Sequence, residues 1–127
     1  MELMQKTIFI AVAGLAGTLL RYGLAAFVTR KYGDTFPWGT LIVNLLGCFL
    51  AGAAFYLTQE KFLVSPTLRA VIMIGLLGGF TTFSSYGLQT FTLLREGQLG
   101  LAALNITASN LLGLLMVWIG YISFKVF

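Results

Sequence analysis

Histidine, cysteine and charged residues are the scarcest features of this sequence. It contains no histidine and one cysteine, Cys48, so it cannot form an internal disulfide and lacks the side chains of a thiolate or imidazole metal site. Asp, Glu, Lys and Arg make up 9% of its 127 residues, compared with about 25% in an ordinary soluble domain. The composition therefore argues against a soluble globular domain and indicates a membrane protein.

Acidic residues are absent from the long apolar stretches. The acids lie at the ends of these stretches or in polar connections, at Glu2, Asp34, Glu60 and Glu96. Small multidrug exporters share this length and a layout of four spans, but they depend on a glutamate buried in the first helix. Here the first apolar stretch carries Arg21 instead. A small dual-topology secondary exporter of the multidrug-resistance type therefore remains only the alternative function.

Four apolar stretches are each long enough to cross a bilayer as a helix, which needs about 20 residues. They cover about residues 7–29, 38–58, 68–94 and 99–124. Because the connections between them are short, residues 1–127 are expected to form a single all-α membrane domain. Its four transmembrane helices would leave both termini on the same side.

The basic residues are divided almost evenly between the two sides of the membrane. One side would carry Lys6, Lys61, Arg69 and Lys125, and the other Arg30, Lys31 and Arg95. Since an excess of Lys and Arg on one side normally fixes orientation, this balance favours two interpretations equally. In the first interpretation, the chain inserts both ways and forms an antiparallel, dual-topology homodimer. In the second, Arg30 and Lys31 impose one orientation. The basic residues are scattered, mostly at span ends, which suits a lipid interface and not a nucleic acid.

Two polar residues inside the spans have alternative interpretations. Arg21 lies about 12 Å from the nearer end of its span, so it either extends to the interface or attracts anions into a vestibule. In the second span, Thr40, Asn44, Gly47 and Ala51 recur every three or four residues and are expected to share one face. Asn44 either joins helices through hydrogen bonds or offers its amide to a permeating anion.

The fourth span carries a further polar stripe. Asn105, Ser109 and Gly113 follow one another at intervals of four residues, with Asn110 beside them. This stripe predicts one wall of a narrow path.

The third span has an unusually polar centre, GLLGGFTTFSSYG at residues 75–87. Gly78 and Gly79 weaken a helix, and the hydroxyls of Thr81 and Thr82 compete for backbone groups, so the helix is expected to break there. Broken backbone at membrane depth requires protein or water around it. It would free carbonyls for a cation and N–H groups for an anion. After the break, Phe83 and Tyr86 stand on one face, with Ser84 and Ser85 between them.

Three motifs together carry a family resemblance. GGFTTFSSYG, preceded by PWGTLIVNLLG and by LLRYGL in the first span, resembles the CrcB or Fluc family of fluoride channels over essentially the whole chain. The resemblance implies an antiparallel homodimer of four-span subunits with two fluoride pathways. It also implies a structural sodium ion at the dimer interface, held by backbone carbonyls at the break in the third helix.

The resemblance also assigns roles to individual residues. It implies sodium coordination by the backbone carbonyls of Gly78 and Thr81. Asn44 matches the pore asparagine and Phe83 the first of two pore phenylalanines, whereas Tyr86 stands where the second phenylalanine is usual. Asn105 stands where an aromatic residue or histidine often lies. The expected anion pathway comprises Arg21, Thr40, Asn44, Thr82, Phe83, Ser84, Tyr86, Asn105 and Ser109.

The expected function is therefore passive export of cytoplasmic fluoride through a selective channel of the inner membrane, which relieves fluoride toxicity. The expected partners are fluoride, a second copy of the chain and the lipid bilayer. A channel of this kind needs hydrogen-bond donors and no acid–base pair, so the chain is not expected to be an enzyme.

Overall fold

A computed structural model describes all residues from Met1 to Phe127 and contains helices only. The first long helix is α1 (Glu2–Tyr32), and the second joins α2 (Trp38–Phe55) to the π-helical segment η1 (Tyr56–Lys61). The third consists of α3 (Pro66–Ala70), π-helical η2 (Val71–Leu76), α4 (Leu77–Phe80) and α5 (Phe83–Arg95). The fourth consists of α6 (Leu99–Thr107), π-helical η3 (Ala108–Leu112) and α7 (Gly113–Val126).

Local sequence signals explain the ends of these helices. Ser65 caps α3 by accepting the N–H of Leu68 at 3.2 Å, and Pro66 occupies the first helical position, where no donor is needed. Gly33 (φ 84°) and Gly97 (φ 75°) turn the chain after α1 and α5 in a conformation that residues with a Cβ avoid. Each expected span lies inside an observed helix that extends it by a few residues.

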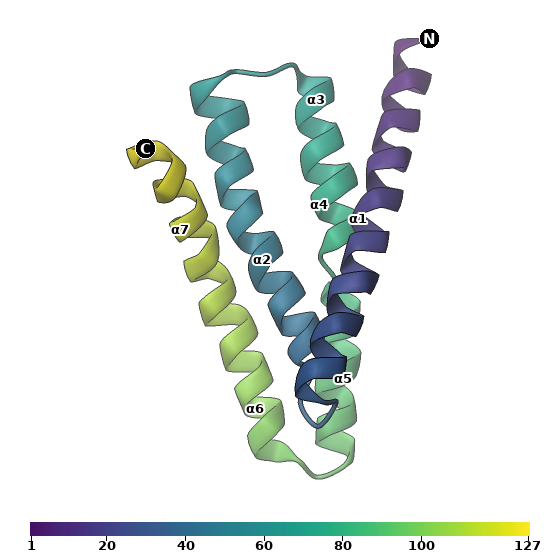
Figure 1. Ribbon diagram of the computed structural model, residues 1–127, viewed down its shortest axis with the longest axis vertical. Helices are drawn as coiled ribbons and strands as arrows, with labels where there is room; N and C mark the ends of the chain where they lie inside the picture. The colour runs from purple at the N-terminus through teal and green to yellow at the C-terminus, as the bar shows by residue number, and fades with distance from the viewer.

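The four long helices are long and apolar enough to cross a membrane. Both chain termini and the connection between η1 and α3 lie at one end of the bundle, and the other two connections lie at the opposite end (Figure 1). Only 20 of the 127 residues are buried, and many large apolar side chains face outward. The prediction of an all-α membrane protein with four spans is therefore confirmed.

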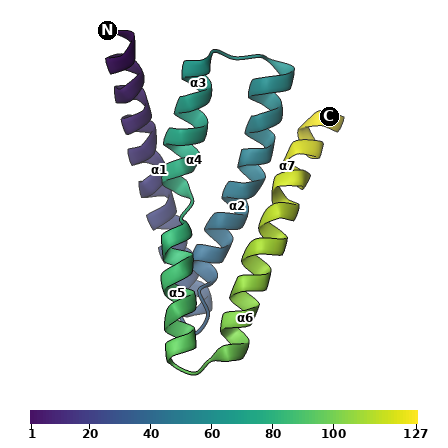
Figure 2. The same cartoon turned by 180° about the vertical axis from the view of Figure 1, so that it is seen from behind.

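Two close helix pairs organise the bundle. α2 packs along α7, and α1 packs on η2 and α4 (Figures 1 and 2). Glycines allow both contacts, since a Cβ on Gly120 would overlap the carbonyl oxygen of Phe49 and a Cβ on Gly79 would overlap that of Gly14. Small residues thus bring the backbones together where no large side chain fits.

Two extended residues separate α4 from α5 in the third long helix. Thr81 has φ −92° and ψ 156°, and Thr82 has φ −147° and ψ 112°. The chain passes from one helical segment to the next near the middle of the bundle (Figure 2). Two backbone groups that a continuous helix would pair bond here to side chains from other helices: the N–H of Thr82 bonds to Asn44, and the carbonyl of Gly79 bonds to Arg21.

Candidate functional site

Asn44 on α2 holds the backbone of Thr82 through two hydrogen bonds. The N–H of Thr82 donates to Asn44 Oδ1 at 2.8 Å, and Asn44 Nδ2 donates to the carbonyl oxygen of Thr82 at 3.0 Å. Because a backbone N–H only donates and a carbonyl only accepts, this pairing fixes which way the amide points. Asn44 therefore joins helices, as one interpretation predicted, and its second amide proton stays available.

Thr82 also caps α5. Its Oγ1 accepts the N–H of Ser85 at 3.2 Å and donates to Ser85 Oγ at 3.0 Å, and Ser84 Oγ lies 3.4 Å away. The capped residue has the extended conformation that an N-cap requires. Thr82 thus fixes both the start of α5 and the direction in which its first turn faces.

The interruption leaves carbonyl groups of α4 without their helical donors. Arg21 Nε donates to the carbonyl oxygen of Gly79 at 3.0 Å, so the arginine reaches across from α1 into the bundle. In a continuous helix Gly78 would accept the N–H of Thr82, but that group is bonded to Asn44. No donor in the chain reaches the carbonyl oxygens of Gly78 and Thr81.

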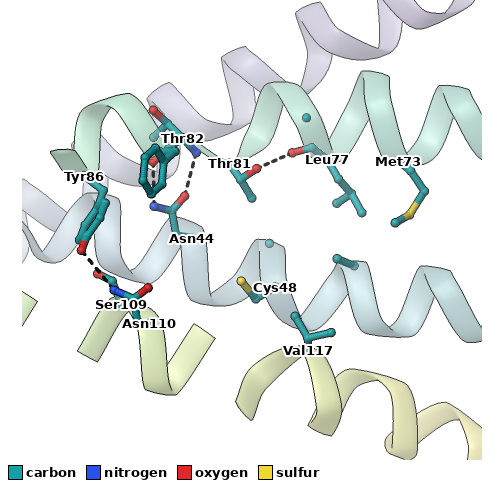
Figure 3. A pocket seen from close by; sticks show the side chains of 14 residues that line it. Asn44, Cys48, Met73, Leu77, Thr81, Thr82, Tyr86, Ser109, Asn110 and Val117 are labelled. Atoms are coloured by element: carbon teal, nitrogen blue, oxygen red, sulfur yellow. Dashed lines mark hydrogen bonds between the residues drawn. The ribbon is translucent and has the colours of Figure 1, made fainter. Parts of the chain in front are cut away.

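A cavity of about 370 Å³ opens beside the interruption. Residues from all but the first long helix line it (Figure 3), and its polar or aromatic members are Asn44, Cys48, Thr81, Thr82, Phe83, Tyr86, Ser109 and Asn110. Its lining includes no charged residue. No cluster of carboxylate, thiolate or imidazole side chains able to hold a metal occurs in the chain. The cavity can therefore offer amide and hydroxyl donors to an anion, and only carbonyl or hydroxyl oxygens to a cation.

The two aromatic residues lie together at this cavity. The ring centroids of Phe83 and Tyr86 are 5.5 Å apart with an angle of 49° between the planes. Phe83 is 82% exposed in the single chain, so its ring contributes little to the packing of that chain. Asn110 Nδ2 donates to the hydroxyl of Tyr86 at 3.2 Å.

The polar stripe of the fourth span divides between two environments. Asn105 is 2% exposed and donates through Nδ2 to Thr90 Oγ1 at 2.9 Å, away from the cavity. Ser109 lines the cavity and lies 3.4 Å from Asn105 Oδ1. The two residues are thus connected, but only Ser109 faces the open volume. Ser84 is exposed and does not line the cavity either.

A second cavity, of about 530 Å³, lies between α1, α2 and the start of α5. It contains Arg21 and Thr40 with further polar residues, Thr18, Tyr22, Thr29, Arg30, Thr82 and Ser85. Thr40 and Asn44, which helical spacing places on one face, therefore line different cavities, whereas Thr82 lines both. Helical spacing is too coarse to separate these positions, because neighbouring cavities meet at the same side of α2.

The lining of the cavities includes residues outside the expected anion pathway, among them Met73, Ser85 and Asn110. The sequence places Asn110 beside the polar stripe, and the π-helical turn η3 brings both Ser109 and Asn110 to the first cavity. Met73, which lines the first cavity, carries no sequence signal beyond its span, and Ser85, which the sequence places between the two aromatic residues, lines the second cavity.

Comparison with known proteins agrees with these features. The family model described as CrcB-like protein, Camphor Resistance (CrcB), matches residues 8–121. The chain is 46% identical over 122 residues to the fluoride-specific ion channel FluC of Opitutus terrae, covering 94% of this chain and 92% of that one. It is 42% identical over 117 residues to the FluC of Nitrosococcus oceani, covering 92% and 94%. It is 45% identical over 117 residues to the FluC of Thermus thermophilus, covering 92% and 91%. This chain belongs to the CrcB family.

Proposed function

We propose that this protein is a fluoride-selective channel through which cytoplasmic fluoride leaves passively across the inner membrane. The observation that carries the proposal is the cavity beside Thr81 and Thr82, which is lined by donors and aromatic rings and has no acidic side chain. The names of the related proteins, which match more than nine-tenths of the chain, support the same function.

The chemistry of fluoride suits this lining. Fluoride is small and holds its water strongly, so a path must replace water by other donors. The second amide proton of Asn44, the hydroxyl of Ser109 and the positive ring edges of Phe83 and Tyr86 supply such contacts. Several weak contacts in succession allow the ion both to enter and to leave.

A proton-coupled exporter is the less favoured function. Such a transporter needs a group that takes up and releases a proton within the membrane. Neither cavity is lined by a carboxylate or an imidazole. The passive channel requires no such group.

We further propose that the working unit is an antiparallel homodimer. The first cavity opens on the surface of the single chain, where Phe83, Asn110 and Gly78 are exposed. Polar groups facing lipid at membrane depth are costly, so a protein surface must cover them. A second copy in the opposite orientation fits the balanced loop charges.

A structural sodium ion at the dimer interface is part of the same proposal. The carbonyl oxygens of Gly78 and Thr81 accept no hydrogen bond in the chain, and hard cations take such oxygens as ligands. Carbonyls of both copies would hold the ion there, and its charge would offset the partial negative charge of their oxygens.

The deciding experiment is ion efflux from liposomes that contain the purified protein. Vesicles loaded with fluoride should empty rapidly without a proton gradient, while matched vesicles loaded with chloride retain their ion. Fluoride efflux that requires a proton gradient would favour the exporter, and no efflux of either ion would refute the fluoride channel.

A further inference from the structure

We propose that Tyr86 presents the proton of its hydroxyl to the permeating anion, and that Asn110 is the positioning residue that orients it. The inference rests on the proposed fluoride channel and deepens it. It concerns a tyrosine where the family resemblance implies a phenylalanine, which has a ring edge but no hydroxyl.

The orientation of the Asn110 amide is fixed by its own helix. Nδ2 donates to the carbonyl oxygen of Ile106 at 2.8 Å, and that oxygen can only accept. The same nitrogen lies 3.2 Å from the hydroxyl oxygen of Tyr86. Since an amide nitrogen has two protons and no acceptor site, Asn110 donates to both oxygens, and Tyr86 accepts.

The hydroxyl of Tyr86 is therefore left with one unused proton. Its one hydrogen-bond partner in the chain is Asn110 Nδ2, which donates to it, so no acceptor in the chain receives its proton. Tyr86 and Asn110 both line the first cavity, and Figure 3 shows their contact beside Ser109 at its edge. The proton cannot point back at the amide, so it is directed towards the open volume.

This arrangement also makes the hydroxyl a better donor. A hydroxyl that accepts one hydrogen bond is polarised and donates the next more strongly. Asn110 thus acts on the anion through Tyr86, by turning the O–H bond and by polarising it. Because fluoride is a compact anion, such a donor stabilises it more than it stabilises a larger halide.

The test is a double-mutant cycle measured as fluoride efflux from proteoliposomes. Tyr86→Phe keeps the ring and removes the donor. We expect efflux to fall about three- to tenfold, which is the effect of losing one hydrogen bond. Asn110→Leu keeps the shape and removes both amide protons, and a similar fall is expected. In the double variant the Asn110 change should add little, because the hydroxyl on which it acts is gone.

Matched controls separate folding from function. Thr92 on the same helix α5 bonds only to its own-helix carbonyl at Leu88, so Thr92→Val should leave efflux unchanged. Each variant is compared with the unaltered protein by its elution in detergent. If Asn110→Leu does not fold, Tyr86→Phe alone still decides whether the hydroxyl matters.

Two results would overturn the inference while leaving the channel intact. One is Tyr86→Phe with undiminished fluoride efflux, which would leave the ring edge as the only contact. The other is an Asn110→Leu defect of equal size with and without the Tyr86 hydroxyl, which would make Asn110 act independently. A failure of the proposed function looks different, since the unaltered protein would then release no fluoride.

Discussion

Replacement of Asn44 by leucine tests whether the interruption of the third span depends on α2. The variant removes both hydrogen bonds to the backbone of Thr82, at 2.8 and 3.0 Å, while keeping a side chain of similar size. The freed N–H of Thr82 can then return to the carbonyl of Gly78, its helical partner. We therefore expect the third span to shift towards a continuous helix.

The size of the shift follows from the two bonds. Each hydrogen bond contributes about 0.5–1.5 kcal/mol net, a range that polar contacts in membranes also share. Two bonds together amount to about 1–3 kcal/mol, so the ratio of interrupted to continuous helix changes about 5- to 150-fold, since about 1.4 kcal/mol is tenfold. At the midpoint of about 2 kcal/mol, this shift alone should lower fluoride efflux by up to about 30-fold if only the interrupted form conducts.

Two measurements check this prediction on the same sample. Fluoride efflux reports function, and amide hydrogen exchange over residues 78–86 reports whether the backbone has become helical. Exchange of the Phe83 and Ser84 amides, which lie in the first turn of α5 and have no helical acceptor, should slow in the variant, whereas Thr92→Val, which loses only a bond within α5, should match the unaltered protein. Wild-type efflux together with unchanged exchange in Asn44→Leu would show that the interruption does not need this side chain.

Three further predictions address the path, the topology and the packing. Phe83→Ile keeps the bulk of the side chain but removes the ring edge, so we expect near loss of fluoride efflux. The protein should still fold because Phe83 is 82% exposed, and normal efflux would mean that the ring only packs. A reporter fused to the C-terminus should give comparable signal from both membrane faces, and two lysines added to one loop should bias it; signal from one face alone would contradict the antiparallel dimer. Gly120→Ala places a Cβ against the carbonyl oxygen of Phe49 and should destabilise the protein by about 1–3 kcal/mol in thermal unfolding. Gly100→Ala, where the space is open, should not, and equal stability of the two would argue against close packing of α2 on α7.

Sequence alone determined the elements and their number. Long apolar runs separated by short polar connections leave no other arrangement than spanning helices, because backbone groups in a bilayer must pair within their own helix. The location of the weak point in the third span was also readable, since adjacent glycines and threonines at 78–82 disfavour a helix, and Thr81 and Thr82 are extended. The absence of acids from the spans already disfavoured an exporter.

Only the tertiary structure decided which polar groups meet. Helical spacing says which residues share a face, but not what that face contacts, so it could not pair Asn44 with Thr82, 38 residues away, or Arg21 with Gly79, 58 residues away. Helical spacing also predicts that Thr40 and Asn44 share one face, but they line different cavities. It could not predict that Asn105 donates a hydrogen bond to Thr90. These pairings depend on the rotation and depth of each helix against its neighbours, which packing of small residues sets between segments far apart in the chain.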